Sequence, residues 1–167
     1  MIKETKIKDM RMLVTPYPAF VDKNATTDDV AKMMIANPRL KTVYVVNHEL
    51  KLLGGITLKR LIRQEFSDLL PNNFEYFGAL DFIGKNTAFD MIERLVYVKE
   101  EDTLKTAFLK MYENELDELP VVDDNLQLIG NIDLLELLTI LIEKKEQESG
   151  KKFLIITSNR PFNKSFK

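Results

Sequence analysis

The sequence contains no cysteine and one histidine among its 167 residues. Without cysteine there is no disulfide framework, no thiolate nucleophile and no cysteine-built zinc site. A single histidine also excludes a multi-histidine metal centre. His48 lies between Asn47 and Glu49, in a polar stretch typical of a solvent-exposed turn. These absences remove the commonest nucleophilic enzymes and many metalloenzymes from consideration.

Long apolar runs are also absent. No stretch approaches the roughly 18 apolar residues of a membrane-spanning helix, and the N-terminal MIKETKIKDM lacks the apolar core of a signal peptide. The composition, 45% hydrophobic and 30% charged, is ordinary for a globular chain of one large or two small domains. We therefore expect a cytoplasmic protein that has no membrane partner.

The charge is unevenly distributed. The net charge is −2, but residues 144–167 hold seven Lys or Arg against two Glu, which leaves 17 basic and 24 acidic groups in residues 1–143. Nucleic-acid binding needs a basic surface that displaces counterions, so this acidic body opposes it. The basic tail suits a solvated terminus.

The chain contains an internal repeat. FVDKNATTDDVAKMM followed by KTVYVVNHELKLLGGITLKRLI matches YVKEEDTLKTAFLKM followed by DELPVVDDNLQLIGNIDLLELL. Met34 aligns with Met111 and Gly54 with Gly130, and a leader ending at Met10 resembles the stretch around Met91. Two copies of one sequence pattern are expected to form the same structural unit, so the repeat guides the assignment of the fold.

Each copy predicts the element order β-α-β-β-α, hence an α+β fold. A short strand carries Val21 or Val98, and Thr26/Thr27 or Asp102/Thr103 are candidate helix N-caps. The apolar helix faces are assigned to Val30, Met33 and Met34, and to Ala107, Leu109 and Met111. A β-branched run, a polar hairpin turn, a third strand and a second amphipathic helix follow.

The repeat divides the chain into four segments. Residues 1–66 form the first unit with its leader, 67–87 an aromatic-rich connecting segment, 88–146 the second unit and 147–167 a basic tail. The aromatics of the connecting segment are too apolar for a free linker. Each unit is too small for much core of its own, so we expect the two to fold together.

These residues resemble the tandem CBS-domain modules, a family named after cystathionine β-synthase. The resemblance spans roughly residues 7–142 and rests on VYVVN and LPVVDDN, the helices ending in Met, and a Gly-x-hydrophobic-Thr-x-x-Asp element after the third strand. It implies two units related by a pseudo-twofold axis and packed through their sheets. It also implies homodimers formed through helices and a non-catalytic role in binding AMP, ADP, ATP or S-adenosylmethionine.

In the first copy, the family element reads GGITLKR. The resemblance places a phosphate at Thr57, where a helix start offers free N–H donors. Arg60 stands at the ribose-binding Asp position and accepts no hydrogen bond. The expected ligand-binding residues of this cleft are Lys41, Thr42, Tyr44, Gly54, Ile56, Thr57, Lys59 and Arg60.

In the second copy, Asp133 replaces the phosphate-facing Thr, while Glu136 keeps a carboxylate at the ribose position. Clustered carboxylates repel a triphosphate unless a cation such as Mg²⁺ accompanies it. The expected residues here are Asp102, Asp117, Leu119, Pro120, Asp133 and Glu136. No cofactor is required, and no residue is assigned to a metal.

Simpler structural roles compete at several of these positions. Thr57 and Asp133 suit helix caps, and Gly54-Gly55 suits close strand–helix packing. Tyr44 suits a core aromatic, and Lys59 with Arg60 suits a solvated helix face. The run FLIIT at 153–157 suits either a docked strand or part of a disordered tail.

The sequence therefore predicts a regulatory module that senses an adenosine-containing nucleotide and modulates a separate, unidentified protein. Three basic residues expected in the first-copy cleft, Lys41, Lys59 and Arg60, favour a phosphorylated ligand. A ligand-free interaction and dimerisation module is the alternative. We expect no catalysis, because neither a nucleophile–base pair nor a Walker-type phosphate loop is present.

Overall fold

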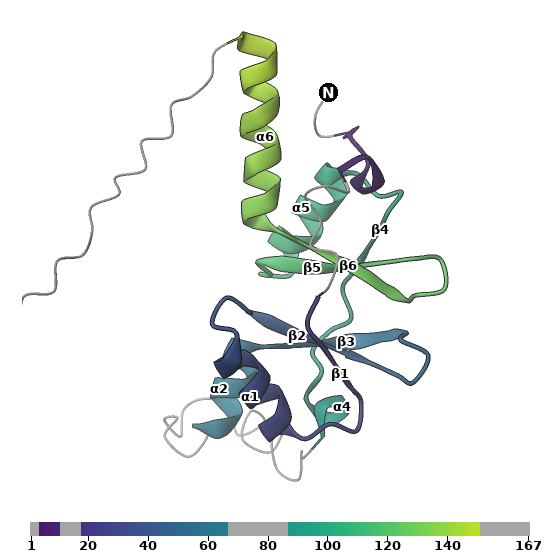
Figure 1. Cartoon of the computed structure of the whole chain (residues 1–167), viewed down its shortest axis with the longest axis vertical. Helices are drawn as coiled ribbons and strands as arrows, with labels where there is room; N and C mark the ends of the chain where they lie inside the picture. Colours follow the sequence, from purple (N-terminus) through teal and green to yellow (C-terminus); the bar gives the residue numbers. More distant parts are fainter. Residues whose placement is uncertain (1–3, 11–17, 67–86, 151–167) are drawn as a thin grey trace, which may run out of the picture.

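The structure is a computed structural model that describes residues 4–10, 18–66 and 87–150. Within them it contains two copies of the predicted β-α-β-β-α unit (Figure 1). The first consists of β1 (Phe20–Asp22), α1 (Thr27–Ala36), β2 (Thr42–Val46), β3 (Leu52–Thr57) and α2 (Leu58–Glu65). The second consists of β4 (Val98–Lys99), α5 (Leu104–Glu113), β5 (Glu118–Val122), β6 (Leu128–Asp133) and α6 (Leu134–Ser149).

The two sheets have the same topology. In each, a short first strand pairs in parallel with the central strand, which pairs antiparallel with the third. The register slips at the same place, between Val45 and Val46 and between Val121 and Val122. Each hairpin has a positive φ, at Leu50 (61°) and Leu126 (63°), where a non-glycine residue is uncommon. The repeat is thus preserved down to backbone irregularities.

Side-chain hydroxyls start the helices. Thr26 caps α1 and Thr103 caps α5, so one of the two candidates was correct in each pair. A capping box at Thr26 satisfies donors that the first helical turn leaves free. The predicted apolar faces are confirmed at Val30, Met34, Ala107 and Met111, whereas Leu109 was wrong: it is 40% exposed, and Leu104 enters the core instead.

The sheets face one another at the centre, with α1 and α2 outside the first and α5 and α6 outside the second (Figure 1). Tyr44 and Leu52 of the first unit pack with Val122 of the second. The backbone N–H of Leu52 donates to the carbonyl of Leu126 at 2.9 Å, which ties the two hairpins together. Packing of the two units through their sheets is therefore confirmed.

The leaders are exchanged between the units. The 3₁₀ helix η2 (Ile7–Met10) places Ile7 in the core of the second unit, where it is 1% exposed. The short helix α4 (Ala88–Met91) places Ala88 and Met91 in the core of the first unit. Backbone hydrogen bonds hold both, including Ile7 N–H to Asp102 O and Ala88 N–H to Ala25 O. Each core is therefore completed by the other copy's leader.

Two predicted segments fall largely outside the described residues. The connecting segment 67–87 is described only at its last residue, and FLIIT at 153–157 is not described. α6 itself continues to Ser149, past the predicted tail boundary at residue 146, and ends at Gly150, whose φ of 63° suits glycine.

Candidate functional site

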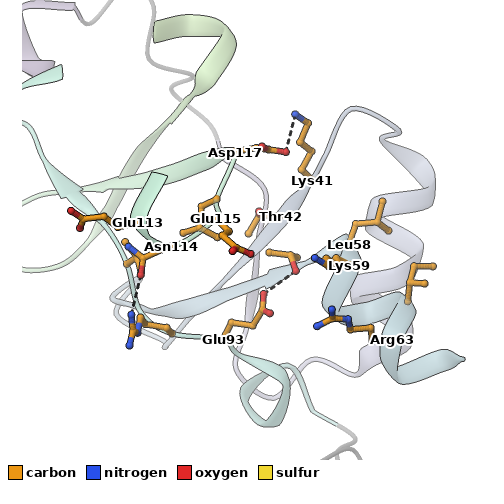
Figure 2. Close-up of a pocket in the computed structure, with 15 residues that line it drawn as sticks. Lys41, Thr42, Leu58, Lys59, Arg63, Glu93, Glu113, Asn114, Glu115 and Asp117 are labelled. Carbon is orange, nitrogen blue, oxygen red and sulfur yellow. Dashed lines mark hydrogen bonds and ion pairs between the residues drawn. The ribbon is translucent and has the colours of Figure 1, made fainter. Parts of the chain in front are cut away.

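A cleft of about 860 Å³ opens between the two units (Figure 2). One side is built by the start of α2 and the residue before β2, the other by the loop from α5 to β5. The connector between α4 and β4 forms the rest. Its lining residues are Lys41, Thr42, Thr57, Leu58, Lys59, Ile62, Arg63, Glu93, Arg94, Val96, Glu113, Asn114, Glu115, Leu116 and Asp117.

Thr57 lies at the start of α2 and uses its hydroxyl twice. The oxygen accepts a hydrogen bond from the N–H of Arg60 at 3.1 Å, which is the N-cap contact. The hydroxyl also donates to Oε2 of Glu93 at 2.8 Å. Thr57 therefore both caps α2 and lines the cleft. It donates its hydroxyl proton to a carboxylate of the chain itself, that of Glu93.

The charged side chains form two walls of opposite sign. Lys59 and Arg63 project from α2, whereas Glu113 and Glu115 lie on the α5–β5 side (Figure 2). Four basic and four acidic side chains line the cleft in total: Lys41, Lys59, Arg63 and Arg94, and Glu93, Glu113, Glu115 and Asp117. Ammonium and guanidinium groups donate and carboxylates accept, so the cleft suits a ligand with both hydroxyls and a polar end group.

Two further contacts join residues that line the cleft. Lys41 Nζ lies 3.5 Å from Asp117 Oδ2, with both side chains more than half exposed. Such an exposed ion pair contributes about 0–1 kcal/mol, so a ligand displaces it at little cost. Arg94 Nη1 donates to Asn114 Oδ1 at 3.1 Å and ties the connector to the end of α5.

A small adjoining pocket of about 30 Å³, called the extension below, shares six lining residues with the cleft: Thr42, Thr57, Glu93, Arg94, Val96 and Leu116. Gly54, Gly55 and Pro120 border it together with Tyr44. The Tyr44 side chain is 3% exposed, and burial raises the pKa of its phenol well above the usual range, with nearby carboxylates adding to the effect. Glu118 also lines the extension, and burial raises its pKa despite hydrogen bonds from Thr42 and Asn131.

The predicted ligand-binding residues of the two copies, apart from Asp102, Asp133 and Glu136, are found in four places. Lys41, Thr42, Thr57 and Lys59 line the cleft, together with Asp117, which was assigned to the second copy. Tyr44, Gly54 and Pro120 border the extension. Ile56 and Leu119 are fully buried in the cores of their own units, and Arg60 lies outside the residues that line the cleft.

The remaining second-copy residues have structural partners. Asp133 and Glu136 form a capping box at the start of α6, in which the Asp133 N–H donates to Oε2 of Glu136 at 2.8 Å and the Glu136 N–H to Oδ1 of Asp133 at 2.7 Å. Asp102 accepts from the Lys99 N–H at 3.0 Å. Capping thus accounts for Asp133, as the structural alternative predicted, and a ligand role for these residues stays a prediction.

The sequence reasoning missed the connector that supplies Glu93 and Arg94. Its position was visible: it follows the repeated leader at Met91, and a charged pair there interrupts the apolar residues Ile92 and Leu95. By the same leader alignment, the matching connector of the other copy falls at residues 12–15, outside the described part of the chain.

Across residues 4–10, 18–66 and 87–150, no three His, Cys, Asp or Glu side chains gather in a way that could hold a metal ion. No helix in this part of the chain is long and apolar enough to cross a membrane.

Comparison with known proteins agrees with the duplicated fold. The family model of the CBS domain matches residues 7–66 and again 87–143. No curated protein sequence matches the chain. A CBS domain-containing protein from Thermotoga maritima is 28% identical, with 84% of this chain and 96% of that chain covered and a TM-score of 0.67.

Two structures solved with ligands share the fold at lower identity. CBSX2 in complex with AMP is 18% identical, covers 84% of this chain and 98% of its own, and has a TM-score of 0.67. A CBS domain pair in complex with 5′-methylthioadenosine and S-adenosyl-L-methionine is 19% identical, covers the same shares and has a TM-score of 0.65. With both repeats matched and the paired fold shared, this chain belongs to the CBS-domain family as a tandem CBS pair.

Proposed function

We propose that the cleft binds an adenosine-containing compound, of the class that includes AMP, ADP, ATP and S-adenosylmethionine, and that the protein is a non-catalytic regulatory module. The observation that carries this proposal is the two-walled cleft lined by Thr57, whose hydroxyl lies at the start of α2. Its volume of about 860 Å³ falls in the range of about 300–1,000 Å³ typical of small-molecule sites. Two structures of the same fold were solved with adenosine compounds.

The lining offers a partner for each part of such a ligand. Val96 and Leu116 present apolar surface where the cleft meets its narrow extension, and this suits the face of a base. The carboxylates of Glu115 and Asp117 accept hydrogen bonds from ribose hydroxyls. Lys59 and Arg63 on the opposite wall interact with whatever polar group the 5′ position carries.

Regulation follows if the ligand prefers one arrangement of the two units. The cleft takes residues from both units, so a bound ligand bridges them and shifts any equilibrium between arrangements by its difference in affinity. We propose that the regulated target is a separate protein in the cytoplasm. Residues 1–143 hold more acidic than basic groups, which disfavours nucleic acid as a partner.

We also propose that the protein is a homodimer. Both units expose apolar side chains at equivalent positions on their helices. A surface that faces only water gives no reason to keep apolar residues at these positions, so a contact surface is indicated. The exposed pairs, which are equivalent in the repeat, are Ile35 with Tyr112, Leu58 with Leu134, Ile62 with Leu138, and Phe66 with Ile142. A second copy of the chain covers both stripes at once. The same surface supports the alternative, a module that dimerises and binds no ligand.

Calorimetric titration separates these functions. Purified protein is titrated with adenosine, AMP, ADP, ATP and S-adenosylmethionine, with and without Mg²⁺. Thr57→Val removes the hydroxyl that faces the cleft, and Thr103→Val removes an N-cap hydroxyl of the same geometry outside it. Saturable binding of at least one of these ligands supports the proposal, and an affinity changed by Thr57→Val but not by Thr103→Val assigns the binding to the cleft. If none of the ligands produces heat, the ligand-free alternative replaces it.

A further inference from the structure

Glu93 occupies the end of the cleft where the family resemblance places a phosphate. Its Oε2 accepts the Thr57 hydroxyl proton at 2.8 Å, and Thr57 is the N-cap of α2. The start of a helix is a favourable place for an anion, because free N–H groups and the helix dipole converge there. In this chain a carboxylate of the protein already lies against that place.

The connector that carries Glu93 is held on both sides. The backbone N–H of Glu93 donates to the Gly55 carbonyl at 3.0 Å, and the Arg94 side chain donates to the Asn114 side chain at 3.1 Å. A Cβ at Gly54 would lie 3.0 Å from Cβ of Ile92, so the strand and the connector approach each other as closely as glycine permits. The backbone of Glu93 is therefore held beside Thr57, within reach of its hydroxyl.

The cleft lining as a whole carries no net positive charge. Its basic and acidic residues are equal in number, and Lys41 forms only a weak, exposed ion pair with Asp117. Lys59 and Arg63 form no ion pair with any described residue, but Glu93 shares their end of the cleft (Figure 2). A phosphate at Thr57 would be placed beside the Glu93 carboxylate, and like charges at such distances repel strongly.

We propose that Glu93 determines specificity by taking the place of the ligand's phosphate at Thr57, so that the cleft selects adenosine compounds whose 5′ substituent is uncharged or positively charged over 5′-phosphorylated ones. This inference rests on the proposed function and narrows its ligand class. It departs from the sequence-based expectation, in which Lys41, Lys59 and Arg60 favoured a phosphorylated ligand, because Glu93 bonds Thr57 in the cleft and Arg60 is not among the lining residues.

The test compares Glu93→Gln with the wild type by calorimetry against adenosine, S-adenosylmethionine, AMP and ATP. Glutamine keeps an acceptor for Thr57 and removes only the charge. We expect Glu93→Gln to bind AMP about tenfold more tightly, and ATP by a larger factor, while adenosine changes by less than about twofold. S-adenosylmethionine, which carries a positive sulfonium, is expected to lose affinity.

Glu113→Gln is the matched control, because Glu113 lines the opposite wall of the cleft, whereas the Thr57 hydroxyl donates to Glu93. Equal gains for AMP in both variants would reduce the effect to net charge and overturn the inference, as would equal gains for adenosine and AMP in Glu93→Gln. Thermal shifts with inorganic pyrophosphate form a separate arm. Stabilisation of Glu93→Gln but not of the wild type upholds the role of Glu93 even if no adenosine compound binds and the proposed function fails.

Discussion

The hydroxyl of Tyr44 in the first unit donates a hydrogen bond to the side-chain carbonyl of Asn131 in the second. Asn131 in turn donates to Oε2 of Glu118 at 3.2 Å, and Thr42 donates to the same carboxylate. These four side chains form a polar chain across the junction of the two sheets. Tyr44 is therefore a buried core aromatic, as the structural alternative predicted, and its hydroxyl also makes a specific polar contact between the units.

Tyr44→Phe is expected to lower the free energy of unfolding by about 1–2 kcal/mol, because the Asn131 carbonyl loses its donor in a part-buried place. Denaturant unfolding measures this change. Tyr112→Phe is the control at a protein concentration where the chain is monomeric, since Tyr112 is then 74% exposed and its hydroxyl bonds water. Equal losses in the two variants would contradict a structural role for the Tyr44 hydroxyl.

Glu118→Gln tests the buried carboxylate through pH. Burial raises the pKa of Glu118, so just above pH 4.5 the folded state holds a proton that the unfolded state has released. Stability contributed by the neutral form is therefore lost as pH rises through the folded pKa. Denaturation of the wild type between pH 4 and 7 should show this decline, and Glu118→Gln should flatten it. A variant with an unchanged pH profile would contradict the assignment.

Ile7→Ala tests the exchange of leaders. Ile7 is 1% exposed in the core of the second unit, and truncating such a side chain costs about 2–5 kcal/mol. Hydrogen exchange should accelerate in α5 and α6 at least as much as in α1 and α2, although Ile7 precedes the first unit in sequence. Acceleration confined to the first unit would contradict the exchange.

Leu138→Glu tests the dimer. Leu138 is 53% exposed and belongs to the duplicated apolar stripe, so a charge there should oppose association. Sedimentation equilibrium should show a dimer for the wild type and a monomer for the variant. Gln147→Glu adds the same charge on the exposed end of α6 and should leave the dimer intact. A monomeric wild type would remove this part of the proposal.

The repeat made the fold predictable, because two copies in register had to form the same unit around residues such as Val45 and Val121. Caps at Thr57 and Asp133 were also predictable, since local sequence determines them. The exchange of Ile7 and Met91 between the cores was not, because a leader's position in the chain carries no information on which copy it packs against.

The site was only partly predictable for a related reason. The family element located Thr57 and Lys59, which lie next to the repeated glycine. Glu93 and Arg94 reach the cleft through long-range packing of the connector against Gly54 and Gly55, and no local pattern encodes that approach. Arg60 is not among the residues that line the cleft, and its predicted ligand role stays a prediction.

The most direct test of the account follows the backbone amides of labelled protein by NMR while adenosine, S-adenosylmethionine or AMP is added. The account predicts saturable shifts concentrated at residues 41–42, 57–63, 93–96 and 113–117, reached at lower concentration with S-adenosylmethionine or adenosine than with AMP. No saturable shifts with any of the three, or shifts confined to another face, would contradict it.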